Sequence, residues 1–329
     1  MKKKSHTPTS AKESKGAIIA AFSANVGIAI AKFIAYTITG STALLAEAAH
    51  SVVDSTNQIL LIIGIKQSKK KPTRTHPFGY GRAHFLYAFM ISIVLFSLGG
   101  MFAVYEGVSK IQHPEMINHP IVAYAVLVIA ALLEGFALRK ALSEARGFKP
   151  KSQSWWQFLQ QTKSVNHVVL ALEDSAALVG LSFAAIGITL SLITGNPVWD
   201  GISTLFIGGL LVCVAFILFR EVKSLLIGEA VGLTQERRLR EIILGVEGVT
   251  KLVDLKTLYT GPMELFIAMK IIVDEEDSAR YVSKTIDEVE AKIRKAFPIA
   301  RLIYVEPDLY KTKKQQLKSD TAIEQSIKK

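Results

Sequence analysis

Six long apolar segments fill the first two thirds of this chain and decide what it can fold into. They cover residues 16–37, 42–65, 84–108, 121–142, 165–193 and 199–219. Each reaches the roughly 20 residues that a helix needs to cross a bilayer. Because lipid leaves backbone N–H and C=O groups without partners, a lone segment of this kind crosses as a helix. The pattern predicts an α-helical membrane domain of six transmembrane helices.

Lysine and arginine are distributed unequally over the connections between these segments. The amino terminus and the second and fourth connections are rich in them, whereas the first (39–41) and fifth (194–197) have none and the third has only Lys110. The positive-inside rule then places both termini in the cytoplasm. The net charge of +11 is explained in this way, so no nucleic-acid partner is expected. We expect a multi-pass protein embedded in the lipid bilayer of a prokaryotic inner (plasma) membrane.

After residue 219 the pattern changes to shorter elements. A helix is predicted over 234–244 with Thr234 as its cap, then strands over 249–258 and 265–273 around a Gly261-Pro262 turn. A second helix over 277–297 and a strand over 300–305 follow. This αββαβ order predicts a small cytoplasmic α+β domain of the ferredoxin-like class.

Four regions follow from these patterns. We expect a basic cytoplasmic amino terminus (1–15), a transport domain (16–219), the α+β domain (220–310) and a charged, disordered tail (311–329). In the fourth connection, residues 154–159 include a Trp pair. They predict either a short interfacial helix at headgroup depth or a loop packed on its own protein.

The second segment contains Glu47, His50 and Asp54, which lie at i, i+3 and i+7 and share one helix face. An ionisable side chain at membrane depth costs at least ~2.5 kcal/mol, so such a stripe needs a partner. A divalent cation would serve, and His with Asp suits zinc better than magnesium or calcium. A hydrogen bond between helices is the alternative for His50 and Asp54. Glu47, nearer the outer end, is expected to meet water and to be the first contact for the cation.

Three further carboxylates lie inside predicted spans. Glu173 and Asp174 are adjacent on the fifth, so only one of them can face the second span, and Glu134 lies on the fourth. Buried carboxylates repel one another unless a cation or a proton intervenes. A purely structural hydrogen bond remains open for each. Protons compete with a metal for such ligands, which is the chemistry that a metal/proton antiporter requires.

With these features the chain resembles the cation diffusion facilitator family of divalent-metal exporters over nearly its whole length. The resemblance is carried by Ala46-Glu47-Ala48-Ala49-His50-Ser51-Val52-Val53-Asp54 and by His76-Pro77-Phe78-Gly79-Tyr80-Gly81. It implies a homodimer that exports zinc in exchange for protons through a tetrahedral site near the middle of the membrane. It also implies that His50, Asp54 and Asp174 are three of the four ligands. Zinc is then cargo, and no resident cofactor is expected.

The fourth ligand departs from the family pattern. The family usually has a second HxxxD motif on the fifth span, but this chain has Leu170 four residues before Asp174. The runs 132–135, 172–177 and 193–197 are similar instead to the branch that contains the mitochondrial zinc transporter of animals. We expect Glu134, Glu173 or a water molecule to complete the shell.

The resemblance also implies a zinc pair in the cytoplasmic domain that this sequence does not support. Residues 220–329 contain no histidine, and we expect the domain to dimerise without a binuclear zinc site. His76, in the second connection, is expected to be structural because the other ligands usual there are missing.

Other functions remain as alternatives. Loss of an imidazole makes the site richer in oxygen, so manganese, iron and cobalt compete with zinc as the exported ion. The missing histidine also fits a non-transporting partner subunit. A metal-dependent membrane enzyme is less favoured, since the chain has no HExxH, nucleophile elbow or phosphate-binding loop, and we expect no enzymatic activity.

Overall fold

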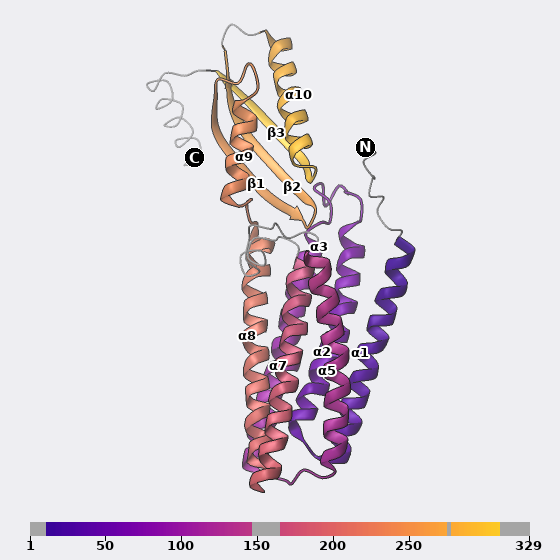
Figure 1. Ribbon diagram of the computed structural model, residues 1–329. Helices are drawn as coiled ribbons and strands as arrows, with labels where there is room; N and C mark the ends of the chain where they lie inside the picture. The colour runs from indigo at the N-terminus through magenta and orange to yellow at the C-terminus, as the bar shows by residue number, and fades with distance from the viewer. Residues whose placement is uncertain (1–10, 147–164, 275–277, 310–329) are drawn as a thin grey trace. The chain divides into compact units, whose positions relative to one another are not determined.

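The computed structural model describes residues 11–146, 165–274 and 278–309. It divides the chain into two units, Met1–Leu226 and Ile227–Lys329. The first unit is built from long helices and the second from a small sheet with two helices (Figure 1).

A helix covers each of the six apolar segments of the first unit. The third segment is one continuous helix, Ala83–Gln112, in which a π-helical stretch interrupts the regular α-helical pattern. The bounds are α1 (Ala11–Thr39), α2 (Thr42–Ser68), α3 (Ala83–Val94), the π-helix η1 (Leu95–Met101), α4 (Phe102–Gln112), α5 (Pro120–Arg146), α7 (Val165–Thr194) and α8 (Val198–Ile227). The helices run alongside one another as a bundle (Figure 1).

Four of these helices are long and apolar enough to cross a membrane within the described residues. They are Ala83–Gln112, Pro120–Lys140, Glu173–Thr194 and Val198–Ile227. The apolar part of α1 is shorter, Asn25–Thr39, and α2 carries the polar stripe. The helical membrane domain is therefore confirmed, whereas six crossings stay a prediction. The possible interfacial segment 154–159 lies outside the described residues.

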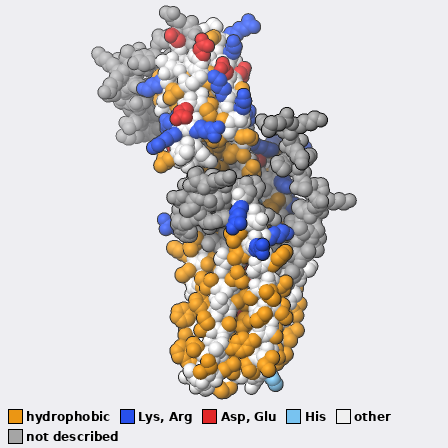
Figure 2. All heavy atoms as spheres, in the orientation of Figure 1, with side chains coloured by type: hydrophobic (Ala, Val, Ile, Leu, Met, Phe, Trp, Pro, Cys, Tyr) orange, Lys and Arg blue, Asp and Glu red, His pale blue; other side chains and the backbone are white. Residues whose placement is uncertain are grey.

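The bundle presents apolar side chains on its outside. Ile121 on α5 is 82% exposed and Phe136 is 72% exposed, and Figure 2 shows hydrophobic side chains over most of the visible face of the bundle. Exposed apolar surface of this extent indicates contact with lipid rather than water.

Glycines bring the third segment and α8 into close contact within one chain. A Cβ added at Gly208 would lie 2.8 Å from the backbone nitrogen of Val104, and one at Gly100 would lie 2.6 Å from Cγ2 of Val212. Both distances are too short for a real Cβ, so the two helices meet backbone to backbone, as small residues allow in membrane helices.

The second unit contains α9 (Leu233–Leu244), β1 (Lys251–Gly261), β2 (Glu264–Val273), α10 (Ala279–Ala296) and β3 (Ala300–Leu309). The sheet order is β1-β2-β3, with β1 antiparallel and β3 parallel to β2. The two helices contact each other, and α9 packs against β1 while α10 packs against β3. The predicted αββαβ order is confirmed as a small mixed sheet with helices. A ferredoxin-like arrangement stays a prediction.

The predicted cap of the first helix in this unit is wrong. The helix begins at Leu233, so Thr234 lies inside its first turn, and Gly232 occupies the cap position without a side-chain hydrogen bond. By contrast, Ser278 caps α10 and accepts a hydrogen bond from the Tyr281 N–H at 3.3 Å.

Candidate functional site

One face of α2 carries polar side chains through the interior of the bundle. Glu47, His50 and Asn57 are at most 1% exposed, and Asp54 is 9% exposed. The i, i+3, i+7 spacing therefore does place the three predicted residues on one buried stripe, and Asn57 extends it by a further turn.

The position of α2 is fixed at its first residues by α8. The Asp200 carboxylate accepts hydrogen bonds from the Ser41 hydroxyl at 2.6 Å and from the Thr42 N–H at 2.7 Å. Gly40, with φ of +71°, makes the tight turn from α1, and Lys110 donates to its carbonyl oxygen at 2.8 Å. These contacts explain the buried acidic residue of α8 as a helix cap rather than a cation ligand.

His50 and Asp54 are two candidate ligands that lie close together on α2. The His50 Nε2 and Asp54 Oδ2 atoms are 3.7 Å apart, which is longer than a hydrogen bond. Among the described residues, no hydrogen-bond partner is present for either ring nitrogen of His50 or for Oδ1 of Asp54. A buried polar group without a partner costs about 1–3 kcal/mol, so atoms of this kind indicate a function other than stability.

On α7 the acidic pair is divided between two environments. Glu173 is buried, and its Oε1 accepts a hydrogen bond from Nδ2 of Asn57 at 2.6 Å. Asp174 is half-buried. Of these two residues, Glu173 therefore makes the hydrogen bond to α2. The assignment of Asp174 as a ligand stays a prediction. Asn57 was missed from the sequence, because an amide in an apolar helix carries no charge to signal its role.

Glu134 is a buried carboxylate of α5, at 6% exposed. Its helix packs against both α1 and α7. Across the described residues, however, no group of three or more His, Cys, Asp or Glu side chains lies close enough to hold a metal ion. The structure therefore brings His50 to Asp54 and Glu173 to α2, but it does not gather the five predicted residues into one shell.

Lys32 of α1 is a buried cation that the sequence interpretation overlooked. It is 0% exposed, and its Nζ lies 2.9 Å from Glu47 Oε2 and 3.0 Å from Ser51 Oγ. The signal was present, since Lys32 is a lone charge inside an apolar segment. The expectation that Glu47 meets water and first contacts the cation is wrong, because its carboxylate is fully buried and paired with Lys32.

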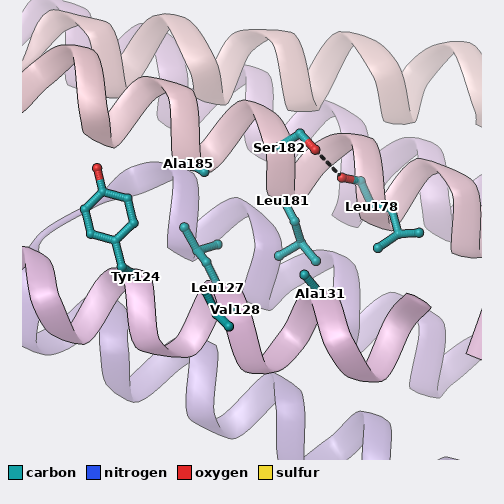
Figure 3. Close-up of a pocket in the computed structure, with 8 residues that line it drawn as sticks. All are labelled: Tyr124, Leu127, Val128, Ala131, Leu178, Leu181, Ser182 and Ala185. Atoms are coloured by element: carbon teal, nitrogen blue, oxygen red, sulfur yellow. Dashed lines mark hydrogen bonds between the residues drawn. The ribbon is translucent and has the colours of Figure 1, made fainter. Parts of the chain in front are cut away.

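A separate apolar pocket lies between α5 and α7 (Figure 3). Its volume is about 280 Å³, and its lining contains no charged side chain. Tyr124 and Ser182 supply the polar side-chain atoms of the lining. The Ser182 hydroxyl donates a hydrogen bond to the Leu178 carbonyl oxygen of its own helix. The pocket does not include the polar stripe of α2, so it is not the cation site.

Two family descriptions cover most of the chain. "Cation efflux transmembrane domain" matches residues 18–227, and "Cation efflux protein, cytoplasmic domain" matches residues 233–308. The boundary between them agrees with the two units of the structure.

The curated relatives include proteins of animals and plants. The chain is 32% identical over 267 residues to "Proton-coupled zinc antiporter SLC30A9, mitochondrial" of Xenopus laevis. This match covers 80% of this chain and 48% of the relative. The protein of the same name from Homo sapiens is 32% identical over 70% of this chain and 41% of its own length. "Metal tolerance protein C4" of Arabidopsis thaliana is 28% identical over 76% of this chain and 55% of its own length.

The chain thus spans about half the length of the curated relatives it matches. The similarity to the branch with the animal mitochondrial transporter is confirmed. The same relatives give no support to the expected prokaryotic inner membrane, because the animal proteins are described as mitochondrial. The long match to the membrane-domain description decides between the transporter and enzyme interpretations: this chain belongs to the cation efflux family, a family of membrane transporters and not of enzymes.

Proposed function

We propose that this chain carries divalent cations across a membrane in exchange for protons, with zinc as the main substrate. The observation that carries the proposal is the buried pair of His50 and Asp54, whose ring nitrogens and carboxylate oxygen Oδ1 have no partner among the described residues. An imidazole nitrogen beside a carboxylate oxygen is a ligand combination that suits zinc. The family membership and the names of the relatives support the same conclusion.

The ligand set is His50, Asp54 and Asp174, completed by Glu173, Glu134 or a water molecule. Support for Glu173 comes from its burial and from its hydrogen bond with Asn57, which links α7 to the polar face of α2.

Exchange for protons follows from the chemistry of these ligands. Imidazole and carboxylate groups bind either a metal or a proton, so a cation that leaves on one side of the membrane is replaced by protons from that side. Oxygen-rich sites discriminate less against manganese, iron and cobalt than sites with more imidazole, so those ions are secondary substrates.

Transport by the purified full chain in liposomes tests this proposal. We expect zinc flux that depends on a pH gradient, and we expect His50→Ala and Asp54→Asn to reduce it by more than about 10-fold, since loss of even an outer partner of a metal ligand commonly costs that much. Repeating the assay with manganese, iron and cobalt ranks the substrates.

Two matched substitutions control for nonspecific damage. His113→Ala removes an exposed histidine, and Asp254→Asn removes an exposed carboxylate of β1, so both should leave flux unchanged. Flux that persists in His50→Ala and Asp54→Asn would contradict the proposed site. A folded wild-type chain without flux for any of the four metals would favour a non-transporting partner subunit.

The proposed topology has six crossings with both termini in the cytoplasm. It is supported by the charge of the connections and by a helix over each apolar segment. Single cysteines can test it in a Cys213→Ala background. Lys71→Cys should react with an impermeant thiol reagent only from the cytoplasmic side and Glu115→Cys only from the opposite side. Reaction of both from one side would exclude six crossings.

We also propose that the chain works as a homodimer, as the match to the family's cytoplasmic domain supports. The mass of the purified full chain, measured by light scattering with the detergent contribution subtracted, should be twice that of one chain. A monomer that transports zinc would contradict this part of the proposal.

A further inference from the structure

We propose that Lys32 is an internal counter-ion that keeps Glu47 from binding the transported cation and so restricts binding to the next turn of α2, at His50 and Asp54. The inference rests on the proposed function, because it assigns a specificity-determining role at the same site. It concerns two residues, Lys32 and Glu47, that the proposed ligand set does not include.

The pair is built as a buried ion pair and not as a surface contact. Both side chains are 0% exposed, and the Lys32 Nζ lies 2.9 Å from Oε2 of Glu47. A hydrogen bond from Nζ to the Ser51 hydroxyl at 3.0 Å holds the ammonium group against α2. Desolvation of two charges generally cancels much of their attraction, so stability alone is a weak reason to keep them there.

Glu47 has the properties of a cation ligand except that its charge is already matched. It lies three residues before His50 on the same face of α2. Its second oxygen, Oε1, is buried without a hydrogen-bond partner among the described residues. Without an ammonium group beside it, this carboxylate would offer both oxygens to a divalent cation held at His50.

The surroundings hold Glu47 in this position. A Cβ added at Gly180 of α7 would collide with Oε1 of Glu47, so the glycine makes room for the carboxylate.

The Lys32 ammonium also interacts electrostatically with His50 and Asp54. A fixed positive charge near the site weakens the binding of another cation there, and this effect grows as the local dielectric constant falls.

The counter-ion role predicts that substitutions of Lys32 and Glu47 change zinc affinity in opposite directions, whereas a purely structural role does not. Lys32→Gln leaves Glu47 as an extra free carboxylate, which should tighten zinc binding. Glu47→Gln leaves an unmatched ammonium group, which should weaken it. If the pair only held α1 against α2, both substitutions would loosen the same contact and shift zinc affinity in the same direction.

Zinc titration of the purified full chain, followed by calorimetry at constant pH, measures the two shifts. We expect Lys32→Gln to bind zinc at least about tenfold more tightly than wild type and Glu47→Gln at least about tenfold more weakly, as expected for one uncompensated charge in a medium of low dielectric constant. The double variant Lys32→Gln/Glu47→Gln should lie between the single variants. Lys32→Arg, which keeps the charge, should bind less tightly than Lys32→Gln.

Shifts of the two single variants in the same direction would overturn the inference. If Lys32→Gln does not fold, the comparison of Glu47→Gln with the double variant still decides, because removing Lys32 must then restore affinity by about tenfold, and equal affinities contradict the proposal. Asp54→Asn separates this inference from the proposed function. Wild-type zinc affinity in Asp54→Asn rejects the site itself, whereas lost affinity there with same-sign shifts at Lys32 and Glu47 rejects only the counter-ion.

Discussion

Acidic side chains on α10 of the C-terminal unit lie at the surface beside basic ones, whereas Glu47, Glu134 and Glu173 of the membrane unit are buried. On α10, Lys292 pairs with Glu288 and Arg294 pairs with Glu290, all at least 32% exposed. In the helical bundle, by contrast, Glu47, Glu134 and Glu173 are at most 6% exposed, and Lys32 is the fully buried cation of the described helices.

The difference shows what each set of charges contributes. Exposed pairs are screened by water and contribute at most about 1 kcal/mol each, so they serve solubility and local helix stability. Buried carboxylates are costly in a membrane, and such residues commonly mark the pathway of an ion. Substitutions that neutralise a carboxylate should therefore affect transport in one unit and almost nothing in the other.

The largest effect on zinc flux is expected from the two acidic residues of α7, which test the contrast between the two units. Glu173→Gln and Asp174→Asn should each reduce zinc flux in liposomes by about 10- to 100-fold, as for other groups that bind or orient a metal ligand. Glu288→Gln, an exposed carboxylate of α10, is the matched control and should have no effect on flux. Wild-type flux in Glu173→Gln would show that its contact with Asn57 is structural, and wild-type flux in Asp174→Asn would remove Asp174 from the ligand set.

A smaller effect concerns the packing on which the buried charges depend. Gly208 and Gly209 are neighbours on α8, but only Gly208 faces Val104 closely, while a Cβ at Gly209 meets nothing within 4 Å. Gly208→Ala should lower the free energy of unfolding by about 1–3 kcal/mol, because the added methyl group overpacks the contact. Gly209→Ala should be neutral or slightly stabilising in the same denaturation measurement. Equal stability of the two variants would contradict the close approach of the helices.

Much of the architecture could be predicted from the sequence, because it depends on patterns that act locally. Apolar length located a helix over every predicted span, and alternation located the first two of the three strands. The cap at Thr234 failed because a shift of two residues moves the cap to Gly232. Such a shift costs little energy, so the sequence alone does not determine it.

The site could be predicted only in part, since its pattern is spread over several helices. Spacing placed Glu47, His50 and Asp54 on one buried face because a single helix fixes their relation. The partner of Glu47 is Lys32 on another helix, 15 residues away in sequence. Which of Glu173 and Asp174 faces α2 depends on the rotation of α7, and that rotation is set by packing between helices.

The smallest expected effect is the pH dependence of a surface pair in the C-terminal unit. Hydrogen bonds to Glu306 and then to Asp308, which lie 2.9 and 3.0 Å away, raise the pKa of Lys270 above its usual value. Its contribution to stability is therefore complete below the unfolded pKa of about 10.4 and is lost as the pH rises through the higher folded pKa. Lys270→Gln should lower the free energy of unfolding of this unit by less than about 1 kcal/mol at neutral pH, with the difference from wild type vanishing in strong alkali. A loss several times larger would show that an exposed pair here matters as much as the buried pair of the membrane unit, and the contrast between the two units would then fail.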